Sequence, residues 1–100
     1  MRRAYKTLTY EEFNVLNKVI KKAGLDCWAV IKQDCHGVDY IYDMEERKRM
    51  CLATGVGLIA EALDCQENFD NCDLEDDEKW TLVSLLTKLN ISLDLVIDWK

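Results

Sequence analysis

The chain has 100 residues, of which 49% are apolar and 32% are charged, and its formal net charge at neutral pH is −6. These values are typical of one globular domain and leave little room for a catalytic scaffold with a separate substrate domain. The longest apolar run, residues 51–60, is only about half of the ~20 residues that a membrane-spanning helix needs, and the N-terminal charges are not followed by the apolar stretch of a signal peptide. We therefore expect a cytoplasmic protein that has no membrane partner.

The first predicted element is a helix over residues 10–23. Thr9 and Glu12 have the spacing of a capping box, in which two side chains accept hydrogen bonds from each other's backbone N–H groups. Apolar residues follow at helical spacing as far as Ala23, and Gly24 supplies the left-handed conformation that commonly ends a helix.

Residues 28–42 predict a β-hairpin. Each end of this range is a run of β-branched and aromatic residues, and the sequence DCHG between the runs suits a type I turn. If Asp34 pairs with Gly37 across the turn, Ile31 lies opposite Tyr40.

The second predicted helix covers residues 44–63. Asp43 and Glu46 repeat the capping-box spacing, and the C-terminal two thirds of the segment are apolar almost all round, which is typical of a buried helix. Gly55 and Gly57 each cost about 1 kcal/mol in a helix interior relative to Ala. We therefore expect another part of the backbone to approach this helix closely.

Residues 64–72 break the helical pattern and are predicted to form a loop. Asp73 would then cap a third helix over residues 74–89, whose first turns are acidic and whose apolar face includes Trp80. Residues 91–99 alternate between apolar and polar, so we expect a strand that pairs with the hairpin, although a helix also fits the pattern.

These elements follow one another in the order α-β-β-α-α-β. The order predicts an α+β fold in which a short antiparallel sheet packs against helices. At this length we expect residues 1–100 to form a single small domain.

The segment from Asp64 to Glu78 holds eight carboxylates and no Lys or Arg. Residues 64–100 carry ten acidic and three basic residues, whereas residues 1–63 carry nine and ten, so the acidity belongs to the C-terminal third. Helix capping and solubility account for some of these acids. The surplus indicates a basic partner, and it argues against direct binding of nucleic acid, whose phosphates would be repelled.

We therefore expect a small non-enzymatic protein that binds another protein through this acidic stretch. Its carboxylates would imitate a row of phosphates and steer a basic, nucleic-acid-handling site toward them. Some phage-encoded inhibitors of host defence nucleases follow the same physical logic, which is an analogy and not a resemblance in sequence. The predicted contact residues are seven acids and one apolar anchor, Phe69, for which a place in the core fits the sequence at least as well. They are Glu67, Phe69, Asp70, Asp73, Glu75, Asp76, Asp77 and Glu78.

A homodimer is the first alternative. The apolar second helix, with Gly55 and Gly57, or an edge strand at 91–99 would form its interface, and the acids would then serve only solubility. A structural or regulatory dimer of this kind needs no charge mimicry.

A metal-binding domain is the second alternative. Its ligands would be Cys35, His36, Cys65 and Cys72, but no C-x-x-C pair occurs, and the acidic stretch does not match a calcium-binding loop. Five cysteines in a cytoplasmic chain are typical of reduced thiols. Adjacent side chains such as Cys35 and His36 rarely point at one another, so these two residues do not indicate a catalytic pair. We predict no catalytic residue, no metal and no cofactor.

Overall fold

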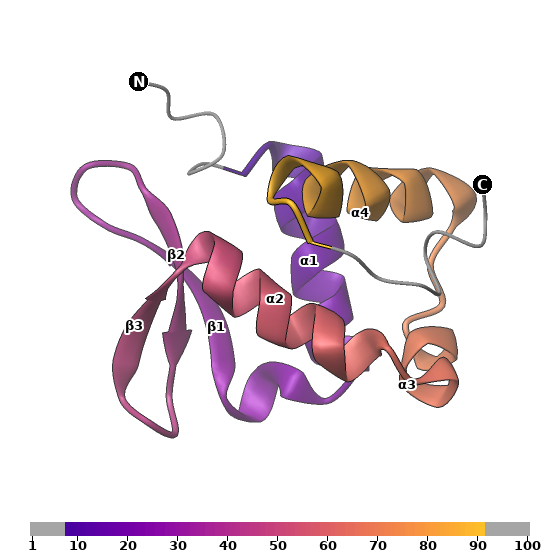
Figure 1. Ribbon diagram of the computed structural model, residues 1–100, viewed down its shortest axis with the longest axis horizontal. Coiled ribbons are helices and arrows are strands. Elements are labelled where there is room, and N and C mark those ends of the chain that lie inside the picture. The colour runs from indigo at the N-terminus through magenta and orange to yellow at the C-terminus, as the bar shows by residue number, and fades with distance from the viewer. Residues whose placement is uncertain (1–7, 92–100) are drawn as a thin grey trace.

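Four α-helices and a three-stranded antiparallel sheet make up residues 8–91, the part of the chain that this computed structural model describes. The elements run in chain order as α1 (Tyr10–Lys22), the short 3-10 helix η2 (Leu25–Cys27), β1 (Ala29–Gln33), β2 (Asp39–Asp43), β3 (Lys48–Cys51), α2 (Leu52–Leu63), α3 (Gln66–Asn71) and α4 (Asp76–Lys88) (Figure 1). The predicted α+β class, with an antiparallel sheet packed against helices, is confirmed.

Helix α1 has the predicted capping box. The Glu12 N–H donates to the Thr9 hydroxyl at 3.1 Å, and the Thr9 N–H donates to the Glu12 carboxylate at 2.9 Å. Gly24 follows the helix with a φ of 75°, as expected of a residue that ends a helix in the left-handed conformation.

The hairpin is present, but its predicted register is wrong by one residue. Gly37 is left-handed, with a φ of 79°, and its N–H donates to the Asp34 carbonyl at 3.1 Å. This adds a residue to the loop, as in a type I turn followed by a bulge. Ile31 therefore pairs with Ile41 and not with Tyr40, and both isoleucines point to the side of the sheet that the helices cover.

Residues 44–51 form a tight turn and strand β3, and not the start of a helix as predicted. The Asp43 side chain accepts hydrogen bonds from the N–H groups of Glu45 and Glu46, both at 2.9 Å, so the apparent capping-box spacing closes a turn. Arg47 has a φ of 54°, which an α-helix does not accommodate. The strand that follows pairs antiparallel with β2, and α2 begins directly after it.

Helix α2 crosses β2 at Gly55, which is buried. A Cβ atom at this position would overlap the side chain of Ile41. A close neighbour is therefore present at Gly55, but it is a side chain and not the backbone that was expected. At Gly57 an added Cβ would meet no atom within 4 Å, so the expectation is wrong there.

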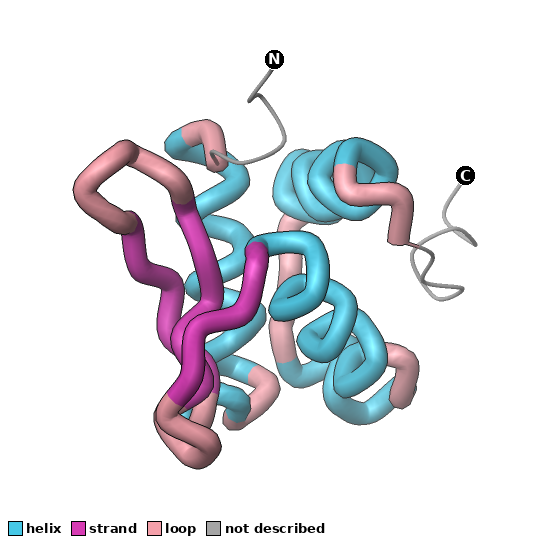
Figure 2. The backbone as a smooth tube through the Cα atoms, turned by 60° about the vertical axis from the view of Figure 1, so that its left-hand side comes forward, coloured by secondary structure: helices cyan, strands magenta, loops and turns pink. Residues whose placement is uncertain are grey.

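The helices lie on one side of the sheet (Figure 2). On that side Ala29, Ile41 and Met50 are buried. Helix α4 packs against α1 and closes the core, and Lys88 of α4 forms an ion pair with the buried Glu12 of α1 at 2.8 Å.

The opposite side of the sheet carries aromatic rings that are covered by cations. The Arg49 guanidinium lies 4.1 Å from the centre of the Tyr40 ring, and the Lys32 ammonium lies 4.8 Å from that of Tyr42. Cation–π contacts therefore contribute to the stability of this side of the sheet, whose two tyrosines are half-buried.

Apart from Ile91, the predicted strand 91–99 lies outside the described residues. Within residues 8–91 the third strand of the sheet is β3. No helix of this part of the chain is long and apolar enough to cross a membrane.

Candidate functional site

Residues 64–78 lie on the far side of the molecule from the sheet, on α3, the loop after it and the first turn of α4 (Figure 1). We name the acidic side chains of this segment the acidic surface. Six of the seven predicted contact acids are exposed, and Glu78 is half-buried. The six exposed acids are Glu67, Asp70, Asp73, Glu75, Asp76 and Asp77.

The local structure of this segment differs from the prediction in two ways. Residues 66–71 form helix α3 where a loop was expected, and Phe69 and Cys72 anchor that helix in the core. Asp73 does not cap the next helix, because its backbone is left-handed with a φ of 51°. Glu75 is the N-cap residue instead, and its N–H donates to the Glu78 carboxylate at 2.8 Å.

The predicted role of Phe69 as an exposed anchor is wrong. Its side chain is only 7% exposed and belongs to the hydrophobic core. A six-residue helix buries few side chains, and this one needs its aromatic ring to dock against the rest of the molecule.

Glu78 serves the local structure more than a binding surface. Its carboxylate accepts a hydrogen bond from the Lys18 ammonium at 2.9 Å as well as from Glu75. The Glu75 N–H, and next Lys18, lower the pKa of Glu78, and the hydrogen bond to Glu78 raises the pKa of Lys18. Lys18 also donates to the Asp73 carbonyl at 3.2 Å and so ties the loop to α1.

Trp80 was predicted to lie on the buried face of α4, but its side chain is 49% exposed. It follows Asp76 by one helical turn, so the indole lies next to the acidic surface. The missed signal is the helical angle: Trp80 precedes the buried Leu82 by two residues, which turns the two side chains about 200° apart.

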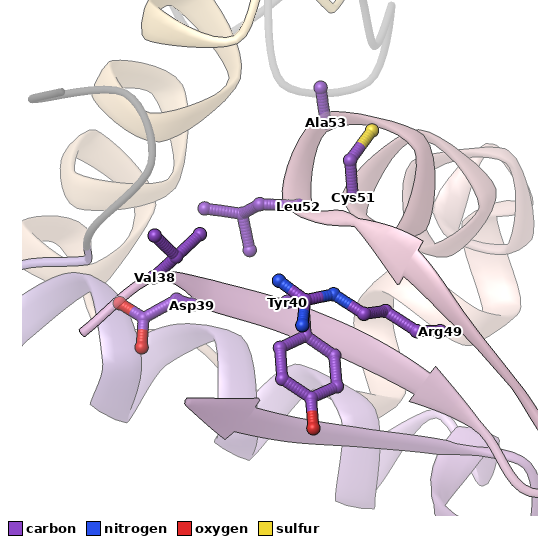
Figure 3. A pocket seen from close by; sticks show the side chains of 7 residues that line it. All are labelled: Val38, Asp39, Tyr40, Arg49, Cys51, Leu52 and Ala53. Atoms are coloured by element: carbon purple, nitrogen blue, oxygen red, sulfur yellow. The ribbon is translucent and has the colours of Figure 1, made fainter. Parts of the chain in front are cut away.

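A second candidate site is a cavity of about 490 Å³ at the point where β3 leaves the sheet and α2 begins. Figure 3 shows its lining side chains, with the Arg49 guanidinium over the Tyr40 ring and the Cys51 sulfur pointing toward Ala53. The cavity is lined by Val38, Asp39, Tyr40, Arg49, Cys51, Leu52 and Ala53.

The charged groups of this cavity already have partners. Arg49 forms an ion pair of 2.7 Å with Asp34 and holds the pKa of that carboxyl down to about 2. Asp39 accepts hydrogen bonds from the Leu8 N–H at 2.6 Å and from the Gln33 amide at 3.2 Å. A charged ligand would therefore have to displace existing contacts, which makes this cavity the weaker candidate.

Cys51 is the chemically distinctive residue of the cavity. Its sulfur lies 3.0 Å from the Thr54 hydroxyl, at the start of α2. That hydroxyl, followed by backbone N–H groups of the first helical turn, lowers the pKa of the Cys51 thiol. The sequence did not indicate the lowered pKa, because Cys51 is recognisable as the N-cap residue of α2 only when the helix is known to begin at Leu52.

The structure does not bring together the four residues of the metal-binding alternative. Cys35 and His36 lie in the hairpin loop, whereas Cys65 and Cys72 flank α3 on the other side of the molecule (Figure 1). All five cysteines are free thiols. Among residues 8–91, no group of three or more Cys, His, Asp or Glu side chains is arranged to hold a metal ion.

Comparisons with known proteins found no family model, no curated protein and no solved structure that matches the chain. Any function must therefore follow from the surfaces of the chain itself. Of the two candidates, the acidic surface has the larger set of exposed charges.

Proposed function

We propose that the protein is a non-enzymatic binding module whose acidic surface occupies a basic site on another protein. The observation that carries this proposal is the exposure of six carboxylates on α3, the following loop and the first turn of α4. Such a concentration of one sign of charge attracts a basic surface and speeds its association.

The capping of α4 accounts for some of these acids and not for others. Asp76 and Asp77 suit the positive end of the α4 dipole. Asp70, in contrast, lies in the last turn of α3, and Asp73 follows that helix. Neither residue takes part in the cap of α4, so both are more easily understood as part of a contact surface.

The partner we propose is a nucleic-acid-handling protein whose basic groove accepts this surface in place of phosphates. A groove that binds a phosphate backbone presents Lys and Arg side chains to a row of negative charges. Carboxylates spread over two helices and a loop would offer such a groove negative charges in place of phosphates. Binding of this kind weakens as salt screens the charges.

Two variants with the same loss of charge test whether position matters. The acidic-surface variant changes four exposed acids and leaves the Glu75–Glu78 cap intact: Glu67→Gln, Asp73→Asn, Asp76→Asn and Asp77→Asn. Asn tolerates the left-handed backbone at position 73. The control variant changes four exposed acids elsewhere: Asp26→Asn, Glu45→Gln, Glu46→Gln and Glu61→Gln.

The wild-type protein and both variants are immobilised and exposed to cell extract at low salt, and bound proteins are eluted with a salt gradient. We expect the wild type and the control variant to retain the same basic protein, released at moderate salt. The acidic-surface variant should lose it. Equal retention by the two variants would show that the acidic surface is not the site that binds the captured protein.

Competition tests the charge mimicry separately. The captured partner is purified and offered its nucleic acid and the wild-type protein together. Mutually exclusive binding is expected. A ternary complex would mean that the acidic surface binds elsewhere on the partner. If the earlier capture from cell extract recovers nothing but the chain itself, that result would favour a homodimer.

A further inference from the structure

One side of helix α4 carries no core residue. Leu82, Leu85 and Leu86 face inward and are buried, whereas the outward side presents a stripe of exposed residues. This stripe consists of Asp76, Asp77, Trp80, Ser84 and Thr87. All of its members are acidic or small and polar except the indole of Trp80.

The surroundings of Trp80 leave its ring accessible. The side chain is 49% exposed, and Ser84, one helical turn further on, is small and exposed. Asp76 and Asp77 precede the indole by four and three residues, which are the spacings at which helical side chains are neighbours. An aromatic face and two carboxylates therefore lie side by side on the surface of α4.

This combination suits a cation that is also planar. An indole is the strongest aromatic partner for a cation, and a guanidinium can stack on it. The edge of a stacked guanidinium still presents N–H groups, which carboxylates accept in paired hydrogen bonds. A lysine ammonium offers neither the planar stack nor the paired geometry.

We propose that Trp80, together with Asp76 and Asp77, binds an arginine side chain of the partner protein. This inference rests on the proposed function, because it specifies how the acidic surface contacts its basic partner. Charge complementarity selects the occupant, since the carboxylates favour a cation and the indole favours a guanidinium. Trp80 thereby takes the anchoring role that Phe69 cannot fill.

The probes are two peptides of equal length, one of arginine and one of lysine, titrated into the full chain. Their dissociation constants are measured by calorimetry, and the indole N–H signal of Trp80 is followed by NMR. We expect the arginine peptide to bind more tightly and to shift the Trp80 signal. Trp80→Ala should weaken arginine-peptide binding about two- to fivefold, the size of an exposed cation–π contact, and bring it close to that of the lysine peptide.

Three further variants make the test specific. Trp80→Leu keeps an apolar side chain without an aromatic face, so it should lose as much affinity as Trp80→Ala. Trp80→Phe, which keeps an aromatic face, should recover part of the affinity. Leu58→Ala removes an apolar side chain that is 40% exposed on α2 and should change nothing. Thermal unfolding of each variant confirms that it is folded.

The failure of this inference differs from the failure of the proposed function. If Trp80→Ala keeps full affinity while the acidic-surface variant loses it, the arginine site is wrong and the acidic surface stands. If Trp80→Leu binds as well as the wild type, the indole supplies only apolar area and the proposal is overturned. If the acidic-surface variant also binds both peptides as tightly as the wild type, both the arginine site and the proposed function are wrong. If the chain forms a dimer and Trp80→Ala dissociates it, the stripe binds a second copy of the chain and not an arginine of a partner, and the proposal is overturned.

Discussion

Cys51, which is exposed, and Cys72, which is buried, differ in what surrounds their sulfur atoms. The Thr54 hydroxyl lowers the pKa of the Cys51 thiol, whereas burial raises the pKa of the Cys72 thiol. Thiolates react and thiols do not, so the two residues should differ in reactivity at any pH below the ordinary thiol pKa.

We therefore expect iodoacetamide to alkylate Cys51 much faster than Cys72 in the folded protein. Thr54→Val should slow the reaction of Cys51 and leave that of the exposed Cys35 unchanged. Peptide mass spectrometry over a time course measures each rate. Equal rates at Cys51 before and after the Thr54 change would contradict the role of the hydroxyl.

The ion pair between Asp34 and Arg49 predicts a change in a measurable pKa. Arg49, and next the Val38 N–H, lower the pKa of Asp34 from 3.8 to about 2. Because the folded-state pKa is depressed, this interaction stabilises the fold above the unfolded-state pKa and is lost as the pH falls toward 2. Arg49→Gln should raise the pKa of Asp34 toward its ordinary value, as followed by NMR titration of the carboxyl group. An unchanged titration would mean that the backbone N–H groups alone hold the carboxylate.

At the scale of the elements, two glycines of α2 should respond oppositely to the same substitution. Gly55→Ala places a methyl group against Ile41, so we expect a loss of about 1–3 kcal/mol of stability through overpacking. Gly57→Ala meets open space, and its helix propensity should add up to about 1 kcal/mol. Urea unfolding of both variants measures the difference. A destabilised Gly57→Ala variant would show that something covers this side of α2.

Capping and periodicity made part of the fold predictable. The Thr9–Glu12 spacing and Gly24 located α1, and the β-branched runs located the hairpin. The same spacing between Asp43 and Glu46 misled, because a side chain that accepts backbone N–H groups closes a turn as readily as it caps a helix. The pairing of residues 48–51 with β2 distinguishes the two outcomes, and the capping-box spacing by itself does not show it.

The candidate site was predictable in its charge and not in its apolar part. Runs of acids without basic neighbours belong on the surface, and six of the seven contact acids are exposed. Which aromatic residue is exposed depends on packing: Phe69 docks α3 into the core, and Trp80 lies on the outward side of α4. Composition alone does not show which of these two residues is exposed. For Trp80, the helical angle relative to the buried Leu82 does indicate exposure.

At the scale of the whole molecule, the acidic surface and the sheet lie on opposite sides (Figure 1). The cations that cover Tyr40 and Tyr42, Arg49 and Lys32, belong to strands of the sheet and not to the acidic surface. A basic partner should therefore approach from one direction. This separation predicts that only charges on the acidic surface govern the affinity.

The most direct test is the dependence of partner affinity on salt, measured for the wild type and the two charge-matched variants. We predict that the wild type and the control variant bind with nearly equal affinity at low salt and weaken steeply as salt is added. The acidic-surface variant should bind more weakly at low salt and depend less on salt. If the two variants instead give the same affinities and the same salt dependence, the acidic surface is not the binding site, and its carboxylates serve capping and solubility.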